Sequence, residues 1–455
     1  MTLESTNPTT GQRIRVYTGA SRAEVSTNLA AASAASLRWS KAGMAERATF
    51  MRNAARILRE SKEKWAVLMA EEMGKPVAQG VAEAEKSAWA CDYFADNGEA
   101  FLAPVEIAAD TRKSYVAFQP LGVILAVMPW NFPFWQVFRA AAPALMAGNA
   151  MVLKHASNVC GCSMAIKAIF EEAGFPTGVF SSLLLDSGEV AALIKDRRIQ
   201  AVTLTGSTEA GRSVARTAGE ALKKVVLELG GSDPYLILED ADLELAASSC
   251  AAGKLINSGQ SCIAVKRIIV VQSIKTRFEE LLLQRMGEYK IGNPLDSTTQ
   301  IGPLAKADIR DAVSVQVERS ISAGARCIMG GKIPRTAGFF YPPTVLTDVH
   351  RGMAVFDQEV FGPVAAIIPV DNEAEAIDCA NDSSYGLGAG IFTRDLSRGE
   401  RIAREELMAG SCFVNAYVRS DPRLPFGGIR ESGFGRELSS FGIREFVNIK
   451  TVYIQ

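Results

Sequence analysis

One cysteine of this chain has the neighbours that a nucleophile needs. Cys262 follows a Gly-Gln-Ser turn in the stretch NSGQSCIAVKR, and Lys266 and Arg267 come four and five residues after it. A glycine turn can present a side chain at the end of a strand or helix, and nearby cations favour the thiolate, which is the reactive form. The alternative is a small buried side chain, as most free cysteines are. The spacing alone leaves both interpretations open.

Four further residues with useful chemistry follow strand-like apolar runs. Asn131 comes after LGVILAVMPW, Lys154 lies at the end of AMVLKH, and Gly206 and Glu228 end the runs before two further turns. The Asn131 amide can donate a hydrogen bond to an oxyanion, and the Glu228 carboxylate can act as a general base. Lys154 suits a ribose or a phosphate, and Gly206, which precedes a helix, exposes backbone N–H groups that can bind a phosphate. Each has an ordinary alternative, such as a turn or capping residue or a solvated acid.

The elements that must position these residues alternate between strands and helices. From residue 121 to 229, five apolar strand-like runs are separated by segments with the spacing of helices. This order predicts right-handed parallel crossovers and a Rossmann-like sheet. Because the carboxyl ends of parallel strands meet at one edge, we expect the four residues together at a dinucleotide site, although residues 205–211 lack the G-x-G-x-x-G fingerprint.

The remaining chain divides into three kinds of segment. The first hundred residues have helical spacing, and a second α/β pattern runs from residue 229 to about residue 430. Segments 111–120 and 444–455 are short, alternating and strand-like. We expect them to pair with each other or across a subunit contact, because a two-stranded piece is marginal alone.

Composition excludes several classes of protein. A chain of 455 residues predicts two or three domains, and a net charge of −1 argues against nucleic-acid or membrane-surface partners. No apolar run reaches the roughly 18 residues of a membrane span, and the N-terminus lacks the apolar region of a signal peptide. The eight cysteines are scattered and only two histidines are present, so we expect no metal site, no histidine triad and a reducing cytoplasm.

Six motifs together resemble those of a known family. PWNFP, LTGSTEAG, LELGG, GQSC, EVFGPV and PFGGIRESGFGRE occur in the order and at the spacings of the aldehyde dehydrogenase superfamily, and the similarity covers nearly the whole chain. Among its members, the chain is most similar to the succinate-semialdehyde dehydrogenases with a short N-terminus. The resemblance implies an α/β fold with a Rossmann-like cofactor domain (1–101 and 121–229), an α/β catalytic domain (230–430), and a small oligomerisation β-strand pair (102–120 and 431–455). Homodimers or homotetramers are usual in this family.

The resemblance also assigns roles to residues. Cys262 would attack the aldehyde carbon while the Asn131 amide and the Cys262 backbone N–H stabilise the oxyanion; hydride transfer to a nicotinamide would leave a thioester. Glu228 would activate the water that hydrolyses it. Glu437 would be either a proton-relay acid or a member of a surface salt bridge. The implied cofactor site comprises Trp130, Lys154, Ser157, Thr205, Gly206, Ser207, Leu229, Glu359 and Phe361.

Two positions bear on cofactor and substrate. Ser157 stands where many relatives carry an acid that binds the ribose, so we expect NADP to be preferred over NAD, with NAD still possible. Arg139 is one of two polar residues in an apolar helix, where a buried cation must find an anion. We expect it to bind the distal carboxylate of succinate semialdehyde, helped by Ser420 or Arg419.

Other functions stay open at this point. Ile256 replaces an arginine that succinate-semialdehyde enzymes often carry, which leaves glutarate semialdehyde, a neutral aliphatic aldehyde or a triose phosphate as alternative substrates. A CoA-acylating enzyme is a further alternative, against which Glu228 argues. A non-catalytic binding protein on the same fold is the alternative from another class, but every catalytic position holds a competent residue.

Overall fold

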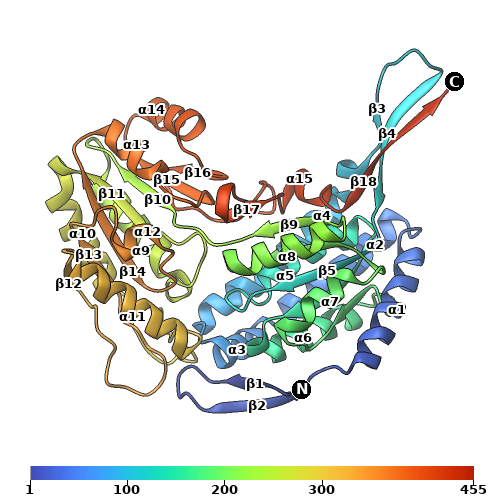
Figure 1. Cartoon of the computed structure of the whole chain (residues 1–455), viewed down its shortest axis with the longest axis horizontal. Helices are drawn as coiled ribbons and strands as arrows, with labels where there is room; N and C mark the ends of the chain where they lie inside the picture. The colour runs from blue at the N-terminus through green and yellow to red at the C-terminus, as the bar shows by residue number, and fades with distance from the viewer. Residues whose placement is uncertain (1) are drawn as a thin grey trace.

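The molecule consists of two α/β units beside each other, with a narrow β-arm projecting from one of them (Figure 1). The structure is a computed structural model that describes residues 2–455. Within that range no helix is long and apolar enough to cross a membrane.

The chain begins with a hairpin that the sequence analysis does not predict. Strands β1 (Thr2–Thr6) and β2 (Arg13–Thr18) pair antiparallel before the first helix. The helices expected from the spacing follow, and the long segment 44–74 is divided because Ser61 leaves the helical conformation, with φ −118° and ψ 19°. These helices are α1 (Arg22–Trp39), α2 (Met44–Glu60), α3 (Lys62–Met73) and α4 (Val77–Leu102).

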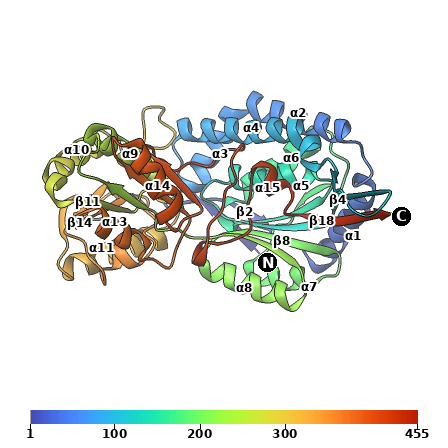
Figure 2. The same ribbon diagram turned by 90° about the horizontal axis from the view of Figure 1, so that it is seen from above.

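The first large sheet contains the five parallel strands that the sequence predicts. In the described chain its order is β17-β9-β8-β5-β6-β7, and only β17 runs antiparallel. Helices α2 and α4 lie on one side of the sheet and α7 and α8 on the other (Figure 2). The elements are β5 (Val123–Met128), α5 (Trp135–Met146), β6 (Ala150–His155), α6 (Cys160–Glu172), β7 (Phe180–Ser182), α7 (Val190–Lys195), β8 (Ile199–Thr205), α8 (Thr208–Glu220), β9 (Lys224–Glu228) and β17 (Gly433–Phe434).

The strand order places a switch point between β5 and β8. The chain runs from β5 outward to β7 and then returns to β8 on the other side of β5. Loops that leave two such strands diverge, and the crevice between them is where α/β sheets bind ligands. Asn131 follows β5 and Gly206 follows β8, so both predicted site residues flank this crevice.

The second large sheet has the order β12-β13-β14-β11-β10-β15-β16, with β12 antiparallel to its neighbour. Two apolar clusters cover its faces, so its inner strands are buried on both sides, as in other parallel sheets. Its elements are β10 (Pro234–Ile237), α9 (Leu243–Leu255), β11 (Arg267–Val271), α10 (Lys275–Gly287), α11 (Ala307–Ser322), β12 (Arg326–Met329), β13 (Thr344–Thr347), α12 (Ala354–Asp357), β14 (Val364–Val370), α13 (Glu373–Asn381), β15 (Gly388–Phe392), α14 (Leu396–Arg401) and β16 (Ser411–Val414).

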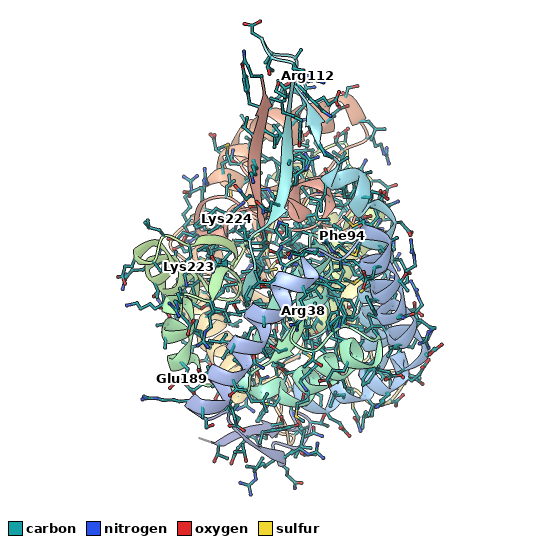
Figure 3. The ribbon with its side chains drawn as sticks, turned by 90° about the vertical axis from the view of Figure 1, so that its right-hand side faces the viewer. Arg38, Phe94, Arg112, Glu189, Lys223 and Lys224 are labelled. Carbon is teal, nitrogen blue, oxygen red and sulfur yellow. The ribbon has the colours of Figure 1, made fainter. Side chains whose placement is uncertain are left out.

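The arm joins two segments that are far apart in the sequence. Strand β18 (Val447–Ile454) pairs antiparallel with β4 (Lys113–Pro120), and the short β3 (Val105–Glu106) lies on the other side of β4. The expected pairing of the two segments within one chain is confirmed. Figure 3 shows Arg112 at the tip of the arm, far from the labelled Phe94 and Glu189 in the body.

One expected boundary needs correction. Segment 431–455 does not belong to the arm as a whole, because β17 extends the first large sheet beside β9. Helix α15 (Ser439–Ile443) then packs on α4 and α5 before the chain enters the arm. The physical reason is that Gly433 and Phe434 form backbone pairs with Glu228 and Leu227 at the end of β9, which holds the start of this segment against the first sheet.

Candidate active site

The turn before Cys262 has an unusual backbone. Asn257 and Ser258 have φ angles of 52° and 56°, and Gly259 continues with 77°. Two consecutive residues with side chains in this region are costly, and such strain persists only where the surroundings hold it. A Cβ on Gly259 would lie 2.1 Å from the carbonyl oxygen of Gly362. Glycine is therefore required here both for its conformation and for the close contact.

Hydrogen bonds tie this turn to the loop that carries Asn131. The Asn257 Nδ2 donates to the carbonyl oxygens of Asn131 (2.7 Å) and Gln260 (3.2 Å). Asn131 Nδ2 donates to the same Gln260 carbonyl at 3.2 Å, and the Gln260 Oε1 accepts from the backbone N–H of Ala305. The nucleophile turn and the amide loop thus form one rigid piece. No protein acceptor in residues 2–455 takes the backbone N–H of Cys262, so this donor and the Asn131 amide are available to one oxyanion.

A buried carboxylate that is not expected from the sequence holds the backbone of the loop that follows Asn131. Glu83 on α4 accepts the backbone N–H groups of Phe134 (2.9 Å) and Trp135 (3.0 Å), which are free donors at the start of α5. Lys75 forms a buried ion pair with Glu83 and lies 3.9 Å from the centre of the Phe132 ring. The signal in the sequence is an acid on the buried, small-residue face of α4.

Burial dominates the electrostatics of Cys262. It raises the pKa of the thiol to about 12, against the smaller opposing effects of Lys266 and Arg139. Lys266 Nζ donates to the carbonyl oxygens of Ser261 (2.9 Å) and Cys262 (2.6 Å) and lies 3.4 Å from Glu359 Oε1. The nearby cations therefore do favour the thiolate, as expected, but burial outweighs their effect on the pKa in this conformation.

Glu228 is at the predicted strand end, but it does not line either of the two cavities next to Cys262. The side chain is buried, and neither carboxyl oxygen has a hydrogen-bond partner among the described residues. Burial raises its pKa well above the usual range, and the nearby Glu437 raises it further. It is absent from the residues that line either cavity over residues 2–455.

Arg139 has a partner within the protein. Its Nε forms an ion pair with Glu437, which comes from the other end of the chain, and both side chains are at most 4% exposed. Its Nη2 donates to Thr205 Oγ1 at 3.3 Å, and its guanidinium lies over the Phe426 ring. That Arg139 binds the distal carboxylate of the substrate stays a prediction: the side chain lines the small cavity next to Cys262, and it would bind the carboxylate while paired with Glu437. The surface salt bridge suggested for Glu437 is wrong, because the pair is buried.

A large cleft opens at the crevice between β5 and β8. Its volume is about 760 Å³, within the range of sites that enclose a cofactor. Ser207 caps α8 by accepting the Ala210 N–H, so the first N–H groups of that helix face the cleft and suit a phosphate. Its lining joins most of the expected cofactor residues to Cys262 and Asn131, namely Trp130, Thr205, Gly206, Ser207, Leu229, Glu359 and Phe361.

The cleft also has a wall that the sequence analysis misses. Three residues at or on α11 of the second unit also line the cleft, namely Lys306, Ile309 and Gln316. No motif marks these residues, because they reach the cleft only through the packing of one unit against the other. Lys154 and Ser157 lie outside this lining: Lys154 is buried at the end of β6, and Ser157 is exposed at the start of the following turn.

A second, narrower cavity of about 180 Å³ meets the first at Cys262 and Gln136. The buried Gln136 Oε1 has no hydrogen-bond partner in the described chain. The expected residues Arg139, Arg419 and Ser420 line this cavity, together with Lys86, which the sequence analysis misses. Ser420 Oγ accepts from Lys86 Nζ (2.8 Å) and from the Trp135 Nε1 (3.1 Å). The thiol thus stands where a cofactor-sized cleft meets a small cationic cavity.

Comparison with known proteins gives a consistent result. A sequence model of the aldehyde dehydrogenase family matches residues 1–452. The chain is 49% identical to a probable succinate-semialdehyde dehydrogenase [NADP(+)] of Synechocystis sp. over the whole of both chains. It is 44% identical to the succinate semialdehyde dehydrogenase [NAD(P)+] of Escherichia coli K12, over 99% of this chain and 97% of that one. The crystal structure of a succinic semialdehyde dehydrogenase from Streptococcus pyogenes in complex with NADP+ aligns with a TM-score of 0.97 at 36% identity, covering 99% of each chain.

Proposed function

This chain belongs to the aldehyde dehydrogenase family, and on that premise we propose that it oxidises succinate semialdehyde to succinate with NADP. The observation that carries the substrate class is the small cavity at Cys262, which is lined by Lys86, Arg139 and Arg419 with Ser420 between them. A cavity with this excess of positive charge suits an aldehyde whose far end is a carboxylate. The names of relatives 44–49% identical over the full length support the same substrate and cofactor.

The protein's own groups account for the carbon chemistry. Cys262 Sγ, once its proton has left, bonds to the aldehyde carbon, and the Asn131 amide and the Cys262 N–H hold the resulting oxyanion. When bound, the nicotinamide cofactor supplies the acceptor for the hydride that leaves this carbon. The acyl group then remains on Sγ as a thioester. Glu228, after rotation toward the cleft, takes a proton from water; the water oxygen attacks the thioester carbon, and the C–S bond breaks to release the acid and the thiolate.

The residues of the cleft fit the cofactor. A Cβ on Gly230 would lie 2.4 Å from Glu359 Oε2, so the cleft floor depends on a glycine where Glu359 approaches the backbone. Glu359 and Phe361 would hold the nicotinamide end, and Gly206 and Ser207 at the α8 N-terminus the pyrophosphate. Lys154, buried at the end of β6, would bind the adenosine ribose phosphate together with Ser157 at the start of the following turn.

Replacing Ser157 with glutamate should reverse the cofactor preference. The added carboxylate would repel a 2′-phosphate and accept a hydrogen bond from an unmodified ribose, as acids do in NAD sites. We expect kcat/KM with NADP to fall about a hundredfold, the size of one lost charged contact, while kcat/KM with NAD rises. Ser157→Gln, which has the same length without the charge, should lose only a few-fold with NADP. Wild-type efficiency that is equal with the two cofactors would refute this assignment.

A panel of aldehydes tests the proposed substrate. Succinate semialdehyde, glutarate semialdehyde, glyceraldehyde 3-phosphate and the neutral 4-methylpentanal, assayed with each cofactor by absorbance of the reduced product, should give the highest kcat/KM for succinate semialdehyde with NADP. The isopropyl end of 4-methylpentanal has the shape of a carboxylate without its charge, so it isolates the electrostatic contribution. A highest value for any other aldehyde of the panel would overturn the substrate assignment.

Two further features support proposals for the assembly and the compartment. The projecting arm exposes Ile449 and Tyr453, which are 64% and 57% accessible, and we infer that it joins copies into a homodimer or homotetramer. All eight cysteines are free thiols, which fits a reducing compartment such as the cytoplasm.

A further inference from the structure

Lys266 is a buried cation beside the nucleophile that none of the reaction steps above uses. Its side chain is 1% exposed, and Glu359 Oε1, 3.4 Å from its Nζ, is the carboxylate that offsets its charge. The Nζ donates to the carbonyl oxygens of Ser261 at 2.9 Å and of Cys262 at 2.6 Å. Hydrogen bonds from an ionised donor are roughly twice as strong as those between neutral groups. The ammonium therefore acts strongly on the backbone around the nucleophile.

A tight turn brings Lys266 back to this backbone. The N–H of Ala264 donates to the Ser261 carbonyl oxygen at 3.1 Å and closes a turn that has Cys262 inside it. The backbone N–H of Lys266 then donates to the Asp233 carbonyl oxygen at 3.3 Å, just before β10, so the chain that leaves the turn is fixed. The Ser261 carbonyl oxygen thus accepts two hydrogen bonds, one from the turn and one from the ammonium.

The Ser261 carbonyl and the Cys262 N–H are the two ends of one peptide bond. This group is planar and conjugated, so a cation at the oxygen draws electron density from the nitrogen and makes the N–H a stronger donor. The Cys262 N–H has no protein acceptor in residues 2–455 and faces the oxyanion together with the Asn131 amide. A donor held in place counts most where negative charge develops during the reaction. The charge of Lys266 therefore reaches the reacting oxygen through a single peptide group.

We propose that Lys266 is a positioning residue that strengthens the oxyanion-binding N–H of Cys262 through the Ser261–Cys262 peptide bond. The inference rests on one step of the proposed function, the attack of Cys262 on a carbonyl carbon. It does not depend on which aldehyde the protein oxidises or on which cofactor it prefers. The effect on the oxyanion adds to the effect of the same charge on the thiol.

Two reactions of the same thiol separate these two effects. With 4-nitrophenyl acetate, Sγ of Cys262 loses its proton to solvent and bonds to the carbonyl carbon through an oxyanion; 4-nitrophenolate then leaves with the electron pair of the C–O bond. With allyl bromide, Sγ loses its proton in the same way and bonds to a saturated carbon as bromide leaves, so no oxyanion forms. The ratio of the two second-order rate constants therefore reports the oxyanion contribution, because any change in the thiolate affects both.

Both rate constants are measured at one pH without cofactor, so a loss of cofactor binding through Glu359 does not enter. Initial release of 4-nitrophenolate, less that of Cys262→Ala, gives the rate constant of acylation. The mass of the peptide that contains Cys262, followed over time, gives the rate constant of alkylation and excludes the other thiols.

Lys266→Met should lower the ratio of acylation to alkylation about tenfold, which is part of the roughly 10²–10³-fold that loss of a whole oxyanion donor costs. Lys266→Gln keeps a donor without the charge and should give an intermediate ratio. Lys254→Met is the matched control, because Lys254 on α9 is also a fully buried lysine, but its Nζ has no hydrogen-bond partner in the described chain. Its ratio should equal that of the wild type.

An unchanged ratio in Lys266→Met overturns the proposal, also where both rate constants fall together, since Lys266 would then act only on the thiol or on the fold. An equal loss in Lys254→Met overturns it too, because any buried charge would then have the same effect. If Lys266→Met fails to fold, Lys266→Gln decides, and a wild-type ratio for that variant overturns the proposal. Neither reagent is an aldehyde, so a failure of the aldehyde panel overturns the proposed function and leaves this ratio unaffected.

Discussion

Cys262→Ala should abolish aldehyde oxidation and leave cofactor binding intact. The cysteine is the thiol at which the cofactor-sized cleft and the cationic cavity meet, and without Sγ no covalent intermediate can form. Loss of a nucleophile removes the whole two-step route, so we expect kcat to fall at least about a thousandfold. Steady-state turnover of succinate semialdehyde and the dissociation constant of NADP, measured by fluorescence, separate the two effects.

The control for this variant is Cys327→Ser, which changes an exposed cysteine of β12 outside both cavities and should turn over like the wild type. A Cys262→Ala protein that keeps a tenth of wild-type turnover would refute the nucleophile assignment.

The raised pKa of Cys262 also predicts how activity depends on pH. Burial raises this pKa to about 12, and the thiolate is the reactive form, so wild-type kcat should increase with pH through the neutral range.

Glu228→Gln should stop the reaction after the thioester has formed. Rapid mixing should show one equivalent of reduced cofactor per active site in a burst, followed by slow turnover, because an amide cannot take the proton of the hydrolytic water. General-base assistance contributes typically 10²–10⁴-fold, which sets the expected loss in the slow phase. The mass of the intact protein after the burst should include one succinyl group on Cys262.

The neighbouring Glu437→Gln provides the comparison, since that acid is also buried but is paired with Arg139. It should show no burst. Normal turnover of Glu228→Gln would transfer the base to another acid, and Glu359 is the nearest candidate, although its Oε1 already accepts from the Gly231 N–H and lies 3.4 Å from Lys266 Nζ. The amide introduced by Glu228→Gln should not destabilise the fold, because it has nearly the shape of the carboxyl group and leaves no charge buried without a partner.

The order of strands and helices in the sequence predicts those site residues that lie at the ends of strands. Asn131, Gly206 and Glu228 could be placed together because parallel strands bring their carboxyl ends to one edge. The partner of Arg139 could not, because Glu437 lies near the other end of the sequence and reaches it only through β17 and α15. The same holds for the hydrogen bond from Lys86 to Ser420, which joins two residues far apart in the sequence.

The electrostatics of the site were also beyond the sequence. Positive residues next to Cys262 in the chain suggest a lowered pKa, yet Lys266 turns its Nζ to two backbone carbonyls and burial decides the outcome. Likewise, an acid at a strand end suggests a base that lines the cleft, whereas Glu228 is buried and does not line it in this conformation. Side-chain direction and solvent access are properties of the packed protein, and residue order specifies them only indirectly.

The arm has a consequence for the fate of a newly made chain. Strand β18 is an edge of its sheet, so one row of its backbone N–H and C=O groups faces outward next to the exposed Ile449, Tyr453 and Ile454. Open, apolar strand edges template the growth of aggregates. Lys450, exposed in the middle of the strand, is the kind of charge that opposes indiscriminate strand addition. When the protein is synthesised faster than it assembles, the uncovered β18 edge should therefore promote aggregation. Slower synthesis at low temperature should favour recovery of the native form.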